Sequence, residues 1–163
     1  DLSDSQIKEG KGKGFYPHVI PNCLGPKSWG STSWSAAGII CPWTIYLCYG
    51  DQQILERQYK SMTRFISWMK KNSDKLINST DMFGDWLAVD HAVTSPAHTP
   101  TPKDLIATAY FIRCTDLMAQ IADIIGKNKD AAKFDQLGKE IRNAFGQEFV
   151  SDKARIAGDT QTA

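Results

Sequence analysis

The sequence contains no apolar run long enough to cross a lipid bilayer. Its longest one, residues 36–49, includes Gly38 and Pro42 and stays short of the roughly 20 residues that a spanning helix needs. A surplus of charge is also missing, because the formal net charge of the 163 residues is +1 and lysine and arginine form no local cluster. From these absences we expect no membrane partner and no nucleic-acid partner.

Several common catalytic and cofactor motifs are absent as well. The sequence has no C-x-x-C pair, no G-x-S-x-G nucleophile elbow and no two histidines at helical i, i+4 spacing. Gly10, Gly12 and Gly14 lack the preceding strand and the following Gly-Lys-Ser/Thr of a phosphate loop. We therefore expect no metal and no cofactor. The four cysteines favour free thiols in a reducing compartment, with a disulfide left open.

The composition is that of a folded globular chain. Hydrophobic residues make up 42% and charged residues 23% of the 163 positions, which excludes disorder. This length supports one ordinary core, so the chain is one domain or a piece of a larger one.

Four helices are predicted from apolar residues that recur at spacings of three and four. They cover about 37–49, 52–72, 101–126 and 129–149. Pro42 falls near the first turn of the first helix, where proline is tolerated. Thr101 is the expected N-cap of the third helix, with Pro102 at the first helical position and Asp104 completing an acidic capping box.

The lengths of the links predict how these helices are arranged. Residues 50–51 and 126–128 form short turns, whereas 21–36, 73–100 and 150–158 are long. Because alternate links between antiparallel helices lie at opposite ends, the long loops should gather at one end. Nearly all-apolar helices also alternate with amphipathic ones. The chain is thus predicted to be all-α, with inner and outer helices as in a helical toroid.

The long loops carry aromatic and acidic side chains together. The aromatic side chains are Trp29, Trp34, Phe83 and Trp86, and the hydrogen-bonding ones are Asp81, Asp85, Asp90, His91, Asp159 and Gln161. A sugar ring offers an apolar C–H face and an edge of hydroxyls, so aromatic faces beside carboxylates suit it. Taken singly, a tryptophan is more often a core residue. The gathering of several at one end favours a sugar site.

The chain resembles the catalytic domain of bacterial α-L-rhamnosidases over essentially its whole length. The resemblance is carried by "SQIKEGKGKGFYPHVIPN", "SWSAAGIICPWTIYLCYGDQQILERQYKSM", "FGDWLA", "TPKDLIATAYFIRCTDLMAQIA" and "DTQTA", in this order. It implies an (α/α)6 barrel that acts on a rhamnose-containing glycoside and hydrolyses terminal α-L-rhamnose with inversion.

The resemblance also implies that residues 1–163 are a single partial domain, the centre of a barrel cut at both ends. In these enzymes the general acid lies upstream and the general base downstream of the matched region. We therefore expect no catalytic residue in this chain and no turnover by it alone. The exposed apolar faces of a partial barrel further predict marginal stability or self-association.

Residue by residue, the resemblance places Trp34, Asp85 and Trp86 in the rhamnose pocket, with Trp86 as stacking platform and Asp85 as acceptor of a hydroxyl proton. The chain departs from the family at Ala36, where an aspartate is usual, at Ser33, where a glycine is usual, and at His18, where relatives commonly have aspartate. Two alternatives stay open. One is a catalytically degenerate toroid that binds carbohydrate or a protein partner, and the other is a plain helical scaffold.

Overall fold

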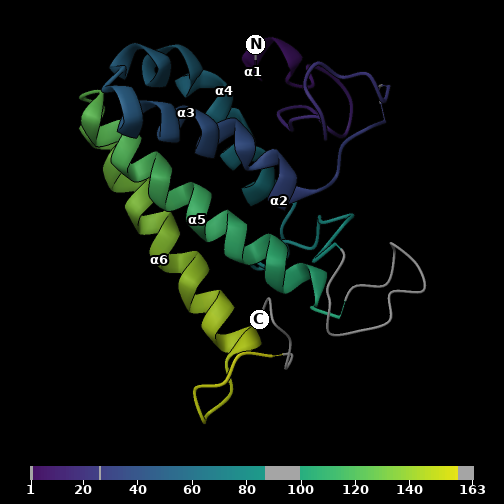
Figure 1. The fold of residues 1–163 in the computed structure, drawn as a ribbon. Coiled ribbons are helices and arrows are strands. Elements are labelled where there is room, and N and C mark those ends of the chain that lie inside the picture. The colour runs from purple at the N-terminus through teal and green to yellow at the C-terminus, as the bar shows by residue number, and fades with distance from the viewer. Residues whose placement is uncertain (1, 26, 87–99, 158–163) are drawn as a thin grey trace.

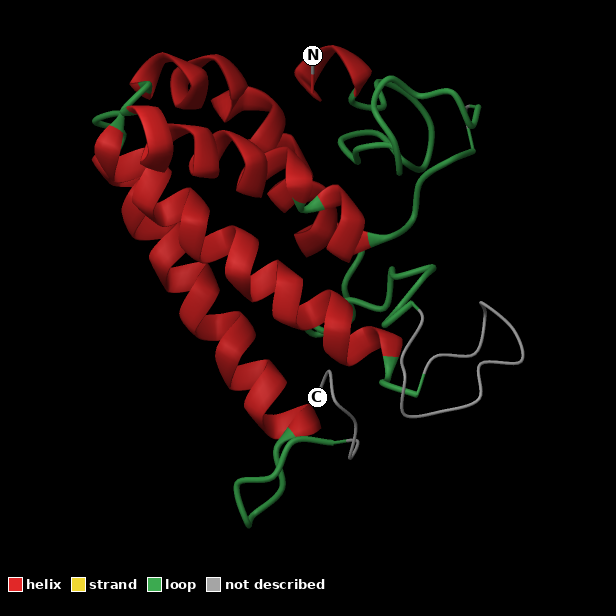
Figure 2. Cartoon of the chain, viewed as in Figure 1, coloured by secondary structure: helices red, strands yellow, loops and turns green. Residues whose placement is uncertain are grey.

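The computed structural model describes residues 2–25, 27–86 and 100–157, and these residues contain helices and loops but no strand (Figures 1 and 2). The six helices are α1 (Leu2–Ser5), α2 (Thr32–Ser35), α3 (Ala37–Tyr49), α4 (Gln52–Lys71), α5 (Lys103–Ile124) and α6 (Asn128–Phe149). The four long helices match the predicted ones to within two residues at each end. No described helix is long and apolar enough to span a membrane.

Local signals explain where these helices begin and end. Gly50 adopts a left-handed conformation with φ 68° after α3, and the Asp51 side chain accepts hydrogen bonds from the backbone N–H groups of Gln53 and Ile54 to cap α4. Gly126, with φ 74°, occupies the same kind of position after α5. Both short turns therefore reverse the chain within a few residues, and Figure 1 shows them at the same end of the molecule.

One detail of the predicted helices is wrong. Pro102, not Thr101, is the N-cap of α5, and no side chain caps this helix. The Thr101 hydroxyl instead donates to Asp85 at 2.6 Å. Pro42 is the sixth residue of α3, near the first turn as predicted. In addition, residues 32–35 of the expected loop form the short helix α2, which leads into α3.

Helix α5 is the centre of the packing. It contacts α2, α3, α4 and α6, and half of its 22 residues are buried. The outer helices α4 and α6 present one apolar stripe each, as the amphipathic pattern predicts. The alternation of inner and outer helices is therefore confirmed, and the arrangement is consistent with part of an (α/α)6 barrel.

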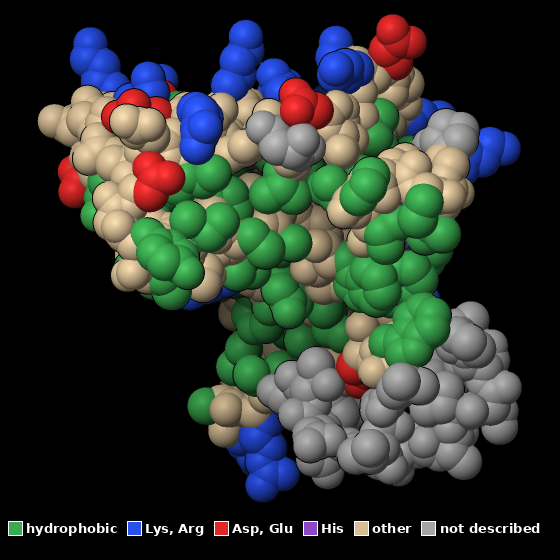
Figure 3. All heavy atoms as spheres, turned by 45° about the horizontal axis from the view of Figure 1, so that its top comes forward, with side chains coloured by type: hydrophobic (Ala, Val, Ile, Leu, Met, Phe, Trp, Pro, Cys, Tyr) green, Lys and Arg blue, Asp and Glu red, His purple; other side chains and the backbone are tan. Residues whose placement is uncertain are grey.

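Helix α3 is the most apolar of the long helices, yet most of it faces outward. Only Gly38, Ile39 and Pro42 are buried, whereas Leu47 is 63% and Tyr49 82% exposed. Figure 3 shows hydrophobic side chains gathered over the middle of one face, below a rim of lysine and arginine. Within the described part of the chain, this face of α3 is therefore left largely uncovered.

An aromatic group in the core joins the N-terminal segment to α4. This core aromatic cluster consists of Phe15, Tyr16, Trp29, Phe65 and Trp68, with ring centroids 4.6–6.0 Å apart. Gly38 of α3 packs so closely on Tyr16 that a Cβ atom would overlap the ring. The Tyr16 hydroxyl donates to Ser61 at 3.0 Å, and burial raises the pKa of this phenol to about 12.

Candidate functional site

Two of the long loops are tied together by the carboxylate of Asp81, which is buried. Its Oδ1 atom accepts hydrogen bonds from the Ser31 hydroxyl at 2.8 Å, the Gly84 N–H at 2.9 Å and the Phe83 N–H at 3.2 Å. Its Oδ2 atom accepts from the Ser33 N–H at 3.0 Å. Asp81 thus holds the start of α2 against the turn at 82–85. Because its carboxylate is buried, it positions the residues of the site and does not line the site's surface.

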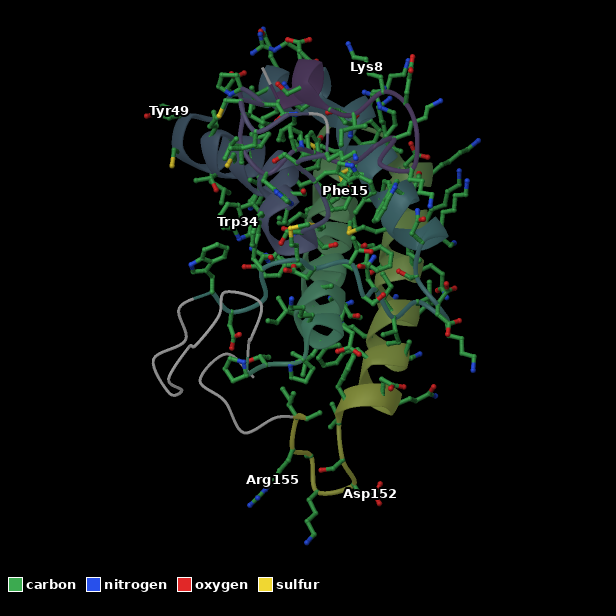
Figure 4. All side chains as sticks on the ribbon, turned by 90° about the vertical axis from the view of Figure 1, so that its right-hand side faces the viewer. Lys8, Phe15, Trp34, Tyr49, Asp152 and Arg155 are labelled. Carbon is green, nitrogen blue, oxygen red and sulfur yellow. The ribbon has the colours of Figure 1, made fainter. Side chains whose placement is uncertain are left out.

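Three segments contribute rings to what we call the site aromatic cluster: His18, Trp34, Phe83 and Trp86. Phe83 lies at its centre, with centroids 4.5 Å from Trp34, 4.7 Å from His18 and 4.9 Å from Trp86. Trp34 is 43% and Trp86 44% exposed, so both indoles lie at the surface. In Figure 4, Trp34 lies at the margin of the molecule while Phe15 lies toward its interior. The predicted partners Trp34 and Trp86 are therefore brought together.

Asp85 lies next to this cluster and has one carboxylate oxygen in use. Thr101 donates to its Oδ2 atom at 2.6 Å, whereas Oδ1 is buried and has no hydrogen-bond partner among the described residues. A carboxylate oxygen in this state can accept a hydrogen bond from a hydroxyl group. Asp85 is thus next in sequence to Trp86 of the site aromatic cluster, and its role as an acceptor stays a prediction. The sequence did not reveal Thr101 as its partner, because the two residues are 16 positions apart on separate segments.

His18 is a member of the site that the prediction of pocket residues did not include. Its Nδ1 atom lies 3.4 Å from the Ser28 hydroxyl, and its Nε2 atom is buried without a partner. Burial lowers the pKa of this imidazole, and the nearby Asp81 carboxylate partly offsets that effect. His18 is therefore neutral at pH 7. Its departure from the family pattern was visible in the sequence, but its ring contacts were not.

Other aromatic and polar residues of the long loops do not lie at the site aromatic cluster or fall outside the described residues. Trp29 belongs to the core aromatic cluster, where it packs against Phe15 and Trp68, so the grouping of Trp29 with the sugar site is wrong. Ala36 is fully buried in the hydrophobic core, so this departure from the family alters a core position and not the surface of the site. Asp90, His91, Asp159 and Gln161 lie outside the described residues.

A cavity of about 860 Å³ lies beside α4 and the loop of residues 10–14 rather than at the site aromatic cluster. Its lining includes four cations, Lys11, Lys13, Arg64 and Lys71, together with Trp29 and Trp68. Its lining also includes Thr80, the residue before Asp81. We place the functional site at the aromatic cluster, because the carboxylate and the unpaired polar atoms are there. The described residues contain no group of three or more metal-ligating side chains.

Stacked helical hairpins with exposed indoles and a carboxylate at one end are consistent with a helical-hairpin glycosidase domain. The chain belongs to the family described as the bacterial alpha-L-rhamnosidase 6 hairpin glycosidase domain, whose model matches residues 1–163. The expected family membership is therefore confirmed.

Individual relatives agree with this assignment. The chain is 37% identical over 163 residues to an alpha-L-rhamnosidase of Streptomyces avermitilis, and 34% identical over 154 residues to one of Alteromonas sp.. It covers 14% and 17% of their lengths, so it spans a small part of each relative.

Solved structures are similar to the chain over nearly all of it. The Streptomyces avermitilis alpha-L-rhamnosidase complexed with L-rhamnose superposes with a TM-score of 0.84, and 99% of this chain and 14% of that chain are covered at 37% identity. The alpha-L-rhamnosidase of Dictyoglumus thermophilum gives a TM-score of 0.82 at 27% identity, covering 94% of this chain and 16% of the other. These likenesses support the glycosidase fold.

Proposed function

We propose that this chain is the central segment of an α-L-rhamnosidase barrel and forms one wall of its rhamnose pocket. The observation that carries the proposal is the unpaired, buried Oδ1 atom of Asp85 beside the exposed indole of Trp86. A sugar bound here stacks its C–H face on an indole and donates a hydrogen bond from one hydroxyl to the carboxylate. Trp34, whose ring centroid is 6.3 Å from that of Trp86, supplies a second apolar face.

In this proposal the chain binds substrate, and other parts of the barrel perform the chemistry. Inverting hydrolysis needs a general acid and a general base, with carboxyl groups about 6.5–9.5 Å apart to admit the attacking water. Asp81 is an unsuitable candidate for either role, because four donors already occupy its oxygens. Asp85 is held by Thr101 and is assigned to binding. The isolated chain is therefore expected to be inactive.

The test uses the full-length protein that carries this segment and an aryl α-L-rhamnoside as substrate. Asp85→Asn should lower kcat/KM by about 10- to 100-fold, because a hydrogen bond to a charged group contributes roughly 1.5–3 kcal/mol. Trp86→Ala should lower it by about tenfold through lost stacking. The control is Lys139→Ala on the polar face of the outer helix α6, where the side chain is 63% exposed.

Two results would contradict the proposal. Full-length protein that is inert on rhamnosides would remove the enzymatic assignment, and equal activity of the Trp86→Ala and Lys139→Ala variants would remove the site. The degenerate toroid that only binds sugar predicts binding without turnover. It is not favoured, because the similar proteins are named alpha-L-rhamnosidases.

We also propose that the isolated chain self-associates through the outward face of α3. Leu47 and Tyr49 there are largely exposed, and contiguous apolar surface of this kind drives association in water. Sedimentation at rising protein concentration should show a growing share of dimers or larger species. Leu47→Glu should shift the distribution back toward monomer, while Lys139→Glu on the polar face of α6 should not. A monomer at all concentrations would contradict this.

A further inference from the structure

Two buried polar side-chain atoms lack a hydrogen-bond partner among the described residues, and both lie at the same site. They are Nε2 of His18 and Oδ1 of Asp85. His18 packs on Phe83, and Phe83 packs on Trp86, the neighbour of Asp85 in sequence. Proteins pair nearly all of their buried polar atoms, so two unpaired atoms in one place indicate a group that arrives from outside.

The His18 ring is held in a defined orientation. Its backbone N–H donates to the Ser28 carbonyl at 3.0 Å, and the Ser28 hydroxyl lies 3.4 Å from Nδ1. Phe83 packs against the ring at a centroid distance of 4.7 Å, and Trp34 lies at 6.2 Å. Ser28 thus occupies one ring nitrogen and leaves Nε2 as the free one.

We propose that His18 is a specificity-determining residue that binds one hydroxyl of the sugar through Nε2, an inference that rests on the proposed function. If Ser28 donates to Nδ1, Nε2 carries a proton and donates to the hydroxyl oxygen. If Nδ1 donates to Ser28, Nε2 accepts the hydroxyl proton. Because a hydroxyl both donates and accepts, it satisfies Nε2 in either tautomer.

The charges around His18 favour a neutral hydroxyl over an anion. The Asp81 carboxylate acts on the imidazole electrostatically. A second carboxylate, that of Asp85, belongs to the residue before Trp86, whose ring packs on Phe83. An anionic ligand would meet both negative charges, and burial keeps the imidazole itself neutral. A sugar hydroxyl pairs with Nε2 without moving charge into this environment.

Access to Nε2 requires the rings around it to move, because the atom has almost no exposed surface. Trp34 is 43% exposed, so its indole is the neighbouring ring with the most freedom to turn toward solvent. Binding at His18 should therefore change the environment of a tryptophan. Rhamnose should alter the tryptophan fluorescence of the full-length protein, and Trp34→Phe should reduce that change.

The decisive experiment is a thermodynamic cycle in the full-length protein, in which His18 is substituted and single hydroxyls are removed from the sugar. Calorimetry gives dissociation constants for L-rhamnose and for its monodeoxy analogues, each lacking one hydroxyl. His18→Phe keeps an aromatic ring against Phe83 and removes the ring nitrogens, and it should weaken rhamnose binding by about tenfold. For one monodeoxy analogue the same substitution should change nothing, because the hydroxyl that His18 binds is already missing.

A second variant separates hydrogen bonding from packing. His18→Gln replaces the ring but retains an amide near the position of Nε2, so it should recover part of the affinity for rhamnose. Equal weakening of every analogue by His18→Phe, or unchanged binding of rhamnose, overturns the inference and leaves the proposed function standing. Unsubstituted protein that neither binds rhamnose nor cleaves an aryl rhamnoside overturns both.

Discussion

The chain contains two aromatic clusters whose residues lie close in sequence. They differ in whether the buried polar atoms of their side chains have hydrogen-bond partners. Phe15 and Tyr16 enter the core aromatic cluster, and His18, two residues further on, enters the site aromatic cluster. In the core the Trp68 indole N–H donates to the Lys11 carbonyl at 2.8 Å and the Tyr16 hydroxyl donates to Ser61. In the site the Nε2 atom of His18 has no partner among the described residues.

Exposure separates the two clusters in the same way. Phe15 and Phe65 are fully buried, whereas Trp34 and Trp86 each expose more than two fifths of their surface. Rings that are buried and whose polar atoms are hydrogen-bonded contribute to stability. Rings that stay half exposed beside unpaired polar atoms are poised for a ligand, and the structure gains little stability from them. The contrast predicts that substitutions in the core aromatic cluster will mainly lower stability, whereas those in the site aromatic cluster will mainly weaken binding.

The largest effect is expected from Phe15→Ala. Phe15 contacts Trp29, Phe65 and Trp68 and is fully buried, so its removal leaves a cavity and should lower the free energy of unfolding by about 3–5 kcal/mol. Trp34→Ala should cost only about 0.5–1.5 kcal/mol, the range typical of lost contacts between aromatic rings. Urea unfolding of the isolated chain measures both, and similar losses would erase the distinction between the clusters.

An intermediate effect is expected from Asp81→Asn, which acts on the frame of the site. Asn has only one acceptor oxygen, so its amide N–H₂ must face either the Ser33 N–H or the donors around Oδ1. We expect a loss of about 1.5–3 kcal/mol of stability. Sugar binding should weaken as well, because the turn that carries Asp85 loses its anchor. Asp74→Asn, at an exposed position, is the control and should change stability by less than about 0.5 kcal/mol.

The helices could be predicted from sequence because their signals are local. Apolar residues at spacings of three and four, Asp51 as N-cap and the glycines at 50 and 126 define each long helix within its own stretch. The site was predictable in part, since Trp34, Asp85 and Trp86 fall on a family pattern. Whether they bind rhamnose stays a prediction.

Tertiary partners could not be predicted in the same way. Thr101 has the residue type of an N-cap, but it donates to Asp85 across a long loop, and that competing partner decides its role. Trp29 and Trp34 are only five positions apart, yet they face different clusters. The N-terminal segment shows no helical period, and it nevertheless places Phe15 and Tyr16 in the core. Loops have no period that reveals which side chains they bury.

The smallest effect is expected from pH, and it concerns His18 alone. Burial lowers the pKa of His18 in the folded chain below its ordinary value of 6.5. Between these two pKa values the unfolded chain binds more protons than the folded one, so stability falls as the pH falls. The stabilisation from neutral His18 is thus complete above pH 6.5 and is lost as the pH drops through the folded pKa.

A comparison of His18→Phe with the unsubstituted chain isolates the contribution of His18 to the pH dependence of stability. Urea unfolding near about pH 8 and about pH 5 includes the titration of every carboxylate, but those groups are common to both proteins and cancel in the difference. The unsubstituted chain should lose more stability on acidification than the variant does. An equal loss in both would mean that the imidazole protonates as readily in the folded chain as in the unfolded one. His18 would then lie in a wetter environment than its unpaired Nε2 atom indicates.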